Sequence, residues 1–179
     1  MKKCLPMIGL ALVLFLLPAR SGSSQEKPGK ERSPELKVLD HFLGSWDIQF
    51  TGPPEATDGP VEKVGSRRRW SQGGKVLIFE DDGEDELVMT LTYDAVERQY
   101  VGTFLLGGMS GHVEGKWESR SKTMNLVIAM KNGNVYRGDH RFIQREVAEV
   151  RGKVFDSSGN LLTELSWKQT LRKSPNKKR

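Results

Sequence analysis

Cysteine is almost absent from this chain: Cys4 is the only one among 179 residues. The remainder of the chain therefore cannot form a disulfide, a thiolate metal site or a cysteine nucleophile, and its fold must depend on its core. Histidine is nearly as scarce, with three residues. No zinc spacing, phosphate-binding loop or serine nucleophile elbow occurs. The sequence predicts no catalytic residue, no metal site and no cofactor.

Long apolar runs are missing too, apart from one near the start, from Leu5 to Leu17. Lys2 and Lys3 precede this run, and Ala19 to Ser21 supply small residues suited to cleavage. At 13 residues the run is short for a bilayer span, so the pattern predicts a secretory signal peptide. An uncleaved N-terminal anchor is the alternative. Because Cys4 precedes the run instead of following it, we expect a secreted or periplasmic protein that is not a lipoprotein.

Excess positive charge is confined to the two ends of the sequence. The formal net charge is +5, from 28 basic and 23 acidic residues. Without Lys2, Lys3 and Arg20 it is +2, and without the five basic residues of 172–179 it becomes −3. A nucleic-acid-binding face needs basic residues built into the fold, so we expect no nucleic-acid partner. The tail is predicted to make at most weak contact with anionic surfaces.

Composition divides the chain into four parts. They are a signal peptide over 1–21, a flexible linker over 22–33, a barrel domain over 34–172 and a basic disordered tail over 173–179. The linker is polar and lacks periodicity, as flexible segments do.

The first structured element is predicted to be a short helix. Ser33 followed by Pro34 is typical of an N-cap and the first helical position. An apolar stripe follows, formed by Leu36, Leu39, Phe42 and Leu43. Such a stripe must pack on something, most simply on the end of a barrel.

From Trp46 onward the apolar period changes to two, which is typical of β-strands. Turn-rich separators follow each strand, and Asn132-Gly133 is the strongest hairpin signal among them. The predicted strands are 46–50, 61–71, 75–82, 86–93, 98–106, 111–118, 123–131, 134–145, 147–156 and 161–172. No helical pattern interrupts them, so the sequence predicts an all-β fold: a roughly ten-stranded antiparallel meander barrel with a short N-terminal helix.

The segment Gly44-Ser45-Trp46, directly after the helix, resembles the opening motif of lipocalins and related calycin barrels. Over about 36–172 the chain also resembles a family of secreted bacterial lipocalin-like proteins of unknown function. The motifs that carry this resemblance are Arg69-Trp70-x-x-Gly73-Gly74, Leu91-Thr92-Tyr93-Asp94 with Tyr100, and Gly115-Lys116-Trp117. It implies a lipocalin-like barrel and no established activity. It also implies that Trp46 lies across a closed end, covered by a basic side chain of the final strand, either Lys168 or Arg172.

Strand alternation places four candidate ligand-binding residues on inward faces: Arg68, Trp70, Tyr136 and His140. Arg68 would clamp a carboxylate or phosphate, unless it lies at the rim and reaches water. His140 would contact a ligand, unless it is paired with Tyr136 or with backbone; a haem ligand is a further alternative. We therefore favour a barrel that binds a small, partly apolar, anionic ligand.

Two other classes of function stay open on the sequence. One is an enzyme with His140 as general base and Arg68 as anion clamp. The other is a non-catalytic cell-envelope interaction module with a filled lumen. The oligomeric state is also open. Among the carboxylates, the acidic run 80–86 is interpreted as a solvated hairpin tip, and Glu114 and Glu118 as surface residues.

Overall fold

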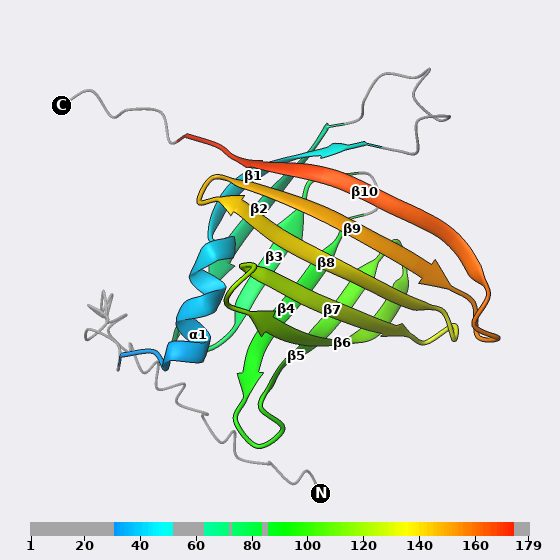
Figure 1. The fold of residues 1–179 in the computed structure, drawn as a ribbon, viewed down its shortest axis with the longest axis horizontal. Coiled ribbons are helices and arrows are strands. Elements are labelled where there is room, and N and C mark those ends of the chain that lie inside the picture. Colours follow the sequence, from blue (N-terminus) through cyan, green and yellow to red (C-terminus); the bar gives the residue numbers. More distant parts are fainter. Residues whose placement is uncertain (1–30, 52–62, 72, 84–85, 174–179) are drawn as a thin grey trace, which may run out of the picture.

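A computed structural model of the chain describes residues 31–51, 63–71, 73–83 and 86–173. The predicted signal peptide, most of the linker and most of the basic tail lie outside these residues. Within them the chain forms a closed antiparallel barrel of ten strands with a short helical segment in front (Figure 1). The predicted all-β, lipocalin-like barrel with an N-terminal helix is confirmed.

The elements follow one another as a meander. The helical segment comprises α1 (Pro34–Val38) and the 3-10 turn η1 (Leu39–Phe42). The strands are β1 (Gly44–Phe50), β2 (Lys63–Trp70), β3 (Leu77–Asp81), β4 (Val88–Asp94), β5 (Gln99–Leu106), β6 (Met109–Glu118), β7 (Thr123–Met130), β8 (Val135–Gln144), β9 (Val147–Phe155) and β10 (Leu161–Leu171). Each strand pairs with the next in sequence, and β1 also pairs with β10, which closes the barrel.

The helical segment seals one end of the barrel (Figure 1). The hydroxyl of Ser33 caps α1 by accepting from the Leu36 amide at 3.4 Å. Leu39 and Phe42 of η1 are fully buried among the inward side chains of the strands. On the barrel side, the Tyr100 hydroxyl donates to the Glu35 carbonyl at 2.9 Å. These contacts fix the seal to the strands around it.

The motif at the start of β1 joins the seal to the barrel wall. Gly44 has φ of +115°, a conformation that favours glycine, and a Cβ there would lie 2.6 Å from the Leu171 side chain. Trp46 is fully buried, and its Nε1 donates to the Phe42 carbonyl at 2.8 Å. The resemblance to lipocalins therefore located this tryptophan correctly, across the sealed end.

The cation over Trp46 comes from a different strand than the resemblance implied. The guanidinium of Arg68, on β2, lies 5.1 Å from the Trp46 ring. Lys168 is exposed, and Arg172 pairs on the outside with Asp47, Nε to Oδ1 at 2.5 Å. The reason is alternation along the strand. Gln169 is buried and faces inward, so its neighbour Lys168 faces outward.

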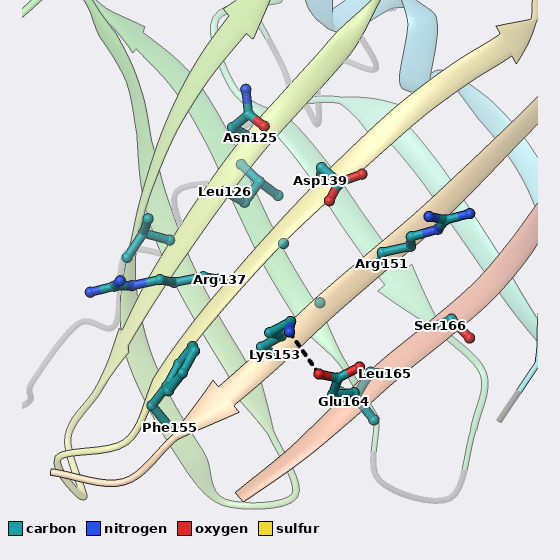
Figure 2. Close-up of a pocket in the computed structure, with 13 residues that line it drawn as sticks. Asn125, Leu126, Arg137, Asp139, Arg151, Lys153, Phe155, Glu164, Leu165 and Ser166 are labelled. Carbon is teal, nitrogen blue, oxygen red and sulfur yellow. Dashed lines mark ion pairs between the residues drawn. The ribbon is translucent and has the colours of Figure 1, made fainter. Parts of the chain in front are cut away.

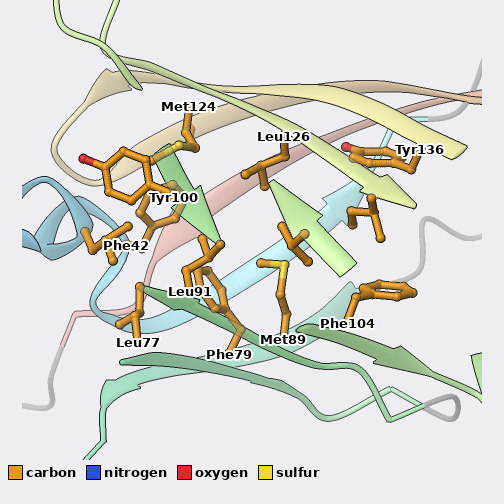
Figure 3. Close-up of a cluster of buried hydrophobic side chains, with 14 of the residues drawn as sticks. Phe42, Leu77, Phe79, Met89, Leu91, Tyr100, Phe104, Met124, Leu126 and Tyr136 are labelled. Carbon is orange, nitrogen blue, oxygen red and sulfur yellow. The ribbon is translucent and has the colours of Figure 1, made fainter. Parts of the chain in front are cut away.

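Side chains from all around the wall fill the barrel beside the seal (Figure 3). Buried aromatic and aliphatic residues from β3, β4, β5 and β7 face one another there, among them Leu77, Leu91, Tyr100 and Met124. Phe142 of β8 packs edge-on against Phe42, with ring centroids 4.8 Å apart. The lumen at this end is thus an apolar core, and polar groups within it stand out.

Candidate functional site

Arg68 is the one charged residue fully enclosed among those that the structure describes, with 4% of its surface exposed. Its Nε donates to the Ser66 hydroxyl at 3.1 Å, and its guanidinium lies 5.3 Å from the Phe79 ring. Its Nη1 has no hydrogen-bond partner in the described part of the chain. Burial lowers the pKa of Arg68 to about 10, with Asp81 acting in the opposite direction. The side chain therefore stays charged at neutral pH in a largely apolar setting.

The acidic group that offsets the charge of Arg68 is Asp81, at the end of β3. Burial raises the pKa of Asp81, and Ser66 and Arg68 partly offset that rise. The ion pairs formed between described residues do not include Arg68. Arg68 is thus only partly compensated by the protein itself.

His140, on β8, is buried with 8% of its surface exposed. Its ring lies 6.1 Å from the Phe42 ring and 6.1 Å from the Trp167 ring. Nδ1 has no partner among the described residues. Burial, followed by the positive charge of Arg68, lowers the pKa of His140 to about 3. The two side chains that alternation placed inside the barrel are therefore close enough to interact electrostatically.

The depressed pKa of His140 bears on the enzyme alternative. A general base works best when its pKa lies near the operating pH. At neutral pH His140 is uncharged and has little tendency to take up a proton. The arrangement suits hydrogen bonding to a ligand better than proton abstraction.

Tyr136, four residues before His140, lies flat against the inner side of the wall. A Cβ placed at Gly138 would be 2.1 Å from the Tyr136 hydroxyl oxygen, and one at Gly152 would be 2.3 Å from its ring. The hydroxyl thus lies over Gly138, about 7 Å along the strand from His140. It is buried without a partner among the described residues, and burial raises its pKa.

Trp70 belongs to a different part of the barrel. It is half-buried at the end of β2, where its Nε1 donates to Asp40 Oδ1 at 2.9 Å. The guanidinium of Arg32 lies 4.4 Å from its ring. Because β2 ends at this residue, its side chain reaches the helical seal instead of the polar groups around Arg68. Of the four predicted residues, the structure brings together Arg68 and His140, places Tyr136 on the same wall as His140, and sets Trp70 apart.

Two residues of β10 that the sequence analysis did not single out carry further buried polar groups. Gln169 has 2% of its surface exposed, and its Oε1 has no partner in the part of the chain that the structure describes. Trp167 faces the same side, and no described residue pairs with its Nε1. The available signal was the alternation Leu165, Trp167, Gln169, Leu171, which sets a glutamine in an otherwise apolar inward face.

Five buried polar atoms on the inner face thus need partners that the described residues do not supply. They are Arg68 Nη1, Tyr136 Oη, His140 Nδ1, Trp167 Nε1 and Gln169 Oε1. Buried polar groups in proteins are nearly always paired, and leaving one unpaired costs about 1–3 kcal/mol. Donors predominate among them, and one carries a full charge. The group best suited to them is a polar or anionic acceptor, supplied by a ligand or by ordered water.

The outer surface carries the other charged clusters that the sequence contains. His112 Nε2 lies 3.8 Å from Glu114 Oε1, with both side chains more than half exposed. Glu80 pairs with Arg69 at 2.9 Å, and part of the acidic run 80–86 lies outside the described residues. Across the described ranges, no group of three or more His, Cys, Asp or Glu side chains is placed to hold a metal ion. None of the helices there is long and apolar enough to cross a membrane.

His140 should make stability depend on pH. Its folded-state pKa of about 3 lies below the ordinary value of 6.5, so the unfolded chain binds the proton more readily. Its contribution is full above pH 6.5 and is lost as the pH falls from there toward 3. Between pH 6 and 4 the wild type should lose about 1 kcal/mol per pH unit more than His140→Gln.

Denaturant melts at several pH values would measure this difference. His41, whose pKa is lowered mainly by burial, acts in the same direction in both proteins and cancels in the comparison. His112→Gln, at an exposed position, serves as the control and should follow the wild type. Parallel curves for wild type and His140→Gln would show that His140 is not held neutral by burial.

Comparison with known proteins supports the barrel fold but does not assign the chain to a family. No protein-family model matches the sequence, and no curated protein sequence matches it. Among solved structures, an S-type phycobiliprotein lyase from Guillardia theta is similar, with a TM-score of 0.53 at 12% identity. The similarity covers 81% of this chain and 96% of that one. At this identity the likeness shows a shared barrel fold.

Two further solved structures are similar to a lesser degree. One is a protein of unknown function from the DUF3598 family of Nostoc punctiforme, with a TM-score of 0.42, 15% identity and coverage of 75% of this chain and 48% of that one. The other is a de novo designed fluorescence-activating β-barrel, with a TM-score of 0.37, 14% identity and coverage of 75% and 97%.

Proposed function

We propose that this barrel binds a small, partly apolar ligand in its lumen through an anionic group held by Arg68. The observation that carries the proposal is the enclosed guanidinium of Arg68, whose Nη1 has no partner among the described residues. Four other buried polar groups of the inner face share this lack of a partner within the described ranges. Burying a charge without full compensation is costly, so such a residue needs a role that offsets the cost. Binding an anion inside a low-dielectric lumen is such a role, because a charge-assisted hydrogen bond is stronger there than in water.

Aromatic rings around the polar groups would bind the apolar part of the ligand. Phe79 and Trp46 flank the guanidinium. The Trp167 ring lies 6.1 Å from the His140 ring, and the Phe142 ring lies 6.3 Å from the Trp46 ring. Lumen sites of this kind combine predominantly apolar walls with a few convergent polar groups. The ligand is therefore an organic anion whose body is apolar or aromatic.

The setting that we propose for this activity is the cell exterior or the periplasm, in a member of the secreted bacterial lipocalin-like family. Support comes from the sequence: the basic residues and apolar run before residue 21, and the motifs that open at Gly44. The basic tail would add weak contact with anionic surfaces.

Displacement of an anionic fluorescent fatty-acid probe tests the lumen site. Arg68→Met keeps an apolar stem of similar length and removes the charged donors. Loss of a charge-assisted hydrogen bond should weaken binding of the probe by about 1.5–3 kcal/mol, which is roughly a 10- to 150-fold rise in Kd. Arg141→Met is the matched control, since Arg141 lies on the outer face of β8 beside His140 and is exposed.

Unchanged probe binding in the lumen variants would contradict the proposal. If Arg68→Met and His140→Gln both bind the probe as the wild type does, the lumen is not the site. The interaction-module interpretation would then lead. Native mass spectrometry of protein purified from its own host would identify a co-purifying ligand directly.

A further inference from the structure

A hollow of about 870 Å³ lies against β7, β8, β9 and β10, on the outer face of the barrel. Its lining comes from these four strands and from no residue across the lumen. Four of the five charged residues that border it project from the wall of β8 and β9 around it in Figure 2: Arg137, Asp139, Arg151 and Lys153. On β8, Arg137 and Asp139 alternate with buried Tyr136 and His140, so they belong to the outward face. On β9, Arg151 and Lys153 alternate in the same way with buried Val150 and Gly152. This hollow is separate from the lumen site.

The floor of the hollow is bare backbone. Gly138 and Gly152 are register partners on β8 and β9, and both border it. On the inner side, the Tyr136 ring occupies the space that a Cβ at either position would need. The wall is therefore one backbone thick here, and a molecule in the hollow would lie directly on the main chain of the two strands.

Two positive charges lie opposite each other along one edge of this floor. Arg137 and Lys153 are register partners on the outer face of β8 and β9. The next two outward pairs on the same strands carry opposite charges, Asp139 with Arg151 and Arg141 with Glu149. Like charges directly opposite each other destabilise a strand pair. The unfavourable pair thus occurs at the hollow, and an anion between the two cations would relieve it.

The protein compensates these cations only in part. Lys153 Nζ pairs with Glu164 Oε1 at 2.6 Å, a contact drawn in Figure 2. The Arg137 guanidinium lies 5.5 Å from the Phe155 ring, and none of the ion pairs between described residues includes it. Arg137 therefore offers a planar set of donors at the edge of the hollow, next to an aromatic surface.

We propose that the hollow is a second binding site, for an organic anion whose charged group lies between Arg137 and Lys153. Its apolar body lies on the glycine floor, against Phe155 and Val127, which is 40% exposed. The volume falls within the 300–1,000 Å³ of typical small-molecule sites, larger than an inorganic anion needs. The site does not depend on Arg68 or on the ligand of the lumen.

Titration of 15N-labelled protein with 2-naphthalenesulfonate, followed by NMR, tests the proposal. The amide signals of Gly138, Gly152 and Lys153 should shift in a saturable way. Arg137→Gln should raise the Kd for these shifts by about 5- to 20-fold, as expected for loss of a charge-assisted contact at a half-open site. Arg141→Gln, four residues along the same face and outside the hollow, is the matched control and should leave the Kd unchanged.

Glu164 supplies a test with the opposite sign. Glu164→Gln removes the carboxylate that compensates Lys153, so it should lower the Kd for 2-naphthalenesulfonate by about 2- to 5-fold. A structural role for these surface charges would not predict tighter binding. The Arg137 and Glu164 side chains are exposed, so neither Arg137→Gln nor Glu164→Gln should disturb folding. Thermal melts would verify this.

Three outcomes would overturn the proposal. The first is a set of shifts confined to the Trp46 and Trp167 indole signals and abolished by Arg68→Met, which places the probe in the lumen. The second is an unchanged Kd in Arg137→Gln. The third is binding of inorganic phosphate as tight as that of 2-naphthalenesulfonate, which would show an ion contact without use of the hollow. Failure of the lumen site leaves this result unaffected, since the two sites are read from different signals.

Discussion

Trp46→Ala should lower the free energy of unfolding by about 3–5 kcal/mol, the usual cost of truncating a buried tryptophan. Its ring has no exposed surface, and it packs against Phe142 and under Arg68. The indole also donates to the Phe42 carbonyl at 2.8 Å, which ties the helical seal to β1. Truncation would therefore leave a cavity, free a buried carbonyl and loosen the seal at once.

Denaturant melts of Trp46→Ala and Trp46→Phe would separate these contributions. The phenylalanine variant keeps most of the ring and loses the hydrogen bond, so it should lose about 1–2 kcal/mol. Val96→Ala, at a position that is 86% exposed, is the control for an uninvolved site. A loss below about 1 kcal/mol in Trp46→Ala would mean that the ring is not the centre of the sealed end.

Arg68→Met, in contrast to Trp46→Ala, should raise the free energy of unfolding of the barrel while it lowers the affinity for the anionic probe. Replacing buried, incompletely paired charges by apolar side chains of similar volume is often neutral or stabilising by about 1–4 kcal/mol. The variant gives up the interaction between the guanidinium and the Trp46 ring, which is worth about 0.5–2 kcal/mol. Since desolvation of the charge is the larger quantity, we expect a net gain of about 1–2 kcal/mol.

Chemical melts without ligand decide this prediction, because bound ligand would stabilise the wild type alone. Arg141→Met, which removes an exposed arginine from the outer face of β8, should change stability by less than about 0.5 kcal/mol. A marked destabilisation in Arg68→Met would show that Arg68 is a structural cover for Trp46. The combination of higher stability and lost binding, by contrast, is what a residue kept for its ligand should show.

Alternation along each strand made much of this fold predictable. In a strand every second side chain lies on the same face, so the sequence alone predicts that Arg68, Tyr136 and His140 point inward. This prediction needs no knowledge of which strands pair. Turn residues such as Asn132-Gly133 then marked where strands end, and β7 and β8 begin and end within one residue of the prediction. Trp46 followed from a motif resemblance instead of from periodicity.

What the sequence did not reveal depends on which strands become neighbours. Trp167 lies beside His140 only because β10 lies next to β9, and β9 next to β8. Trp70 obeys the alternation, yet its partner Asp40 is 30 residues away in the helical seal. The outer hollow likewise rests on the register that sets Arg137 opposite Lys153. Local pattern gives the face of a residue, whereas the partner across the sheet comes from the assembled barrel.

The pairing of the first strand with the last also governs how the chain can fold. Asp47 and Arg172, which join β1 to β10, are separated by 125 positions in the sequence. Contacts of such long range form slowly, because the entropy of closing the loop must be met before they contribute. During synthesis β1 must wait for the final strand to emerge. A chaperone that shields the early strands until β10 has emerged should therefore raise the yield of native protein.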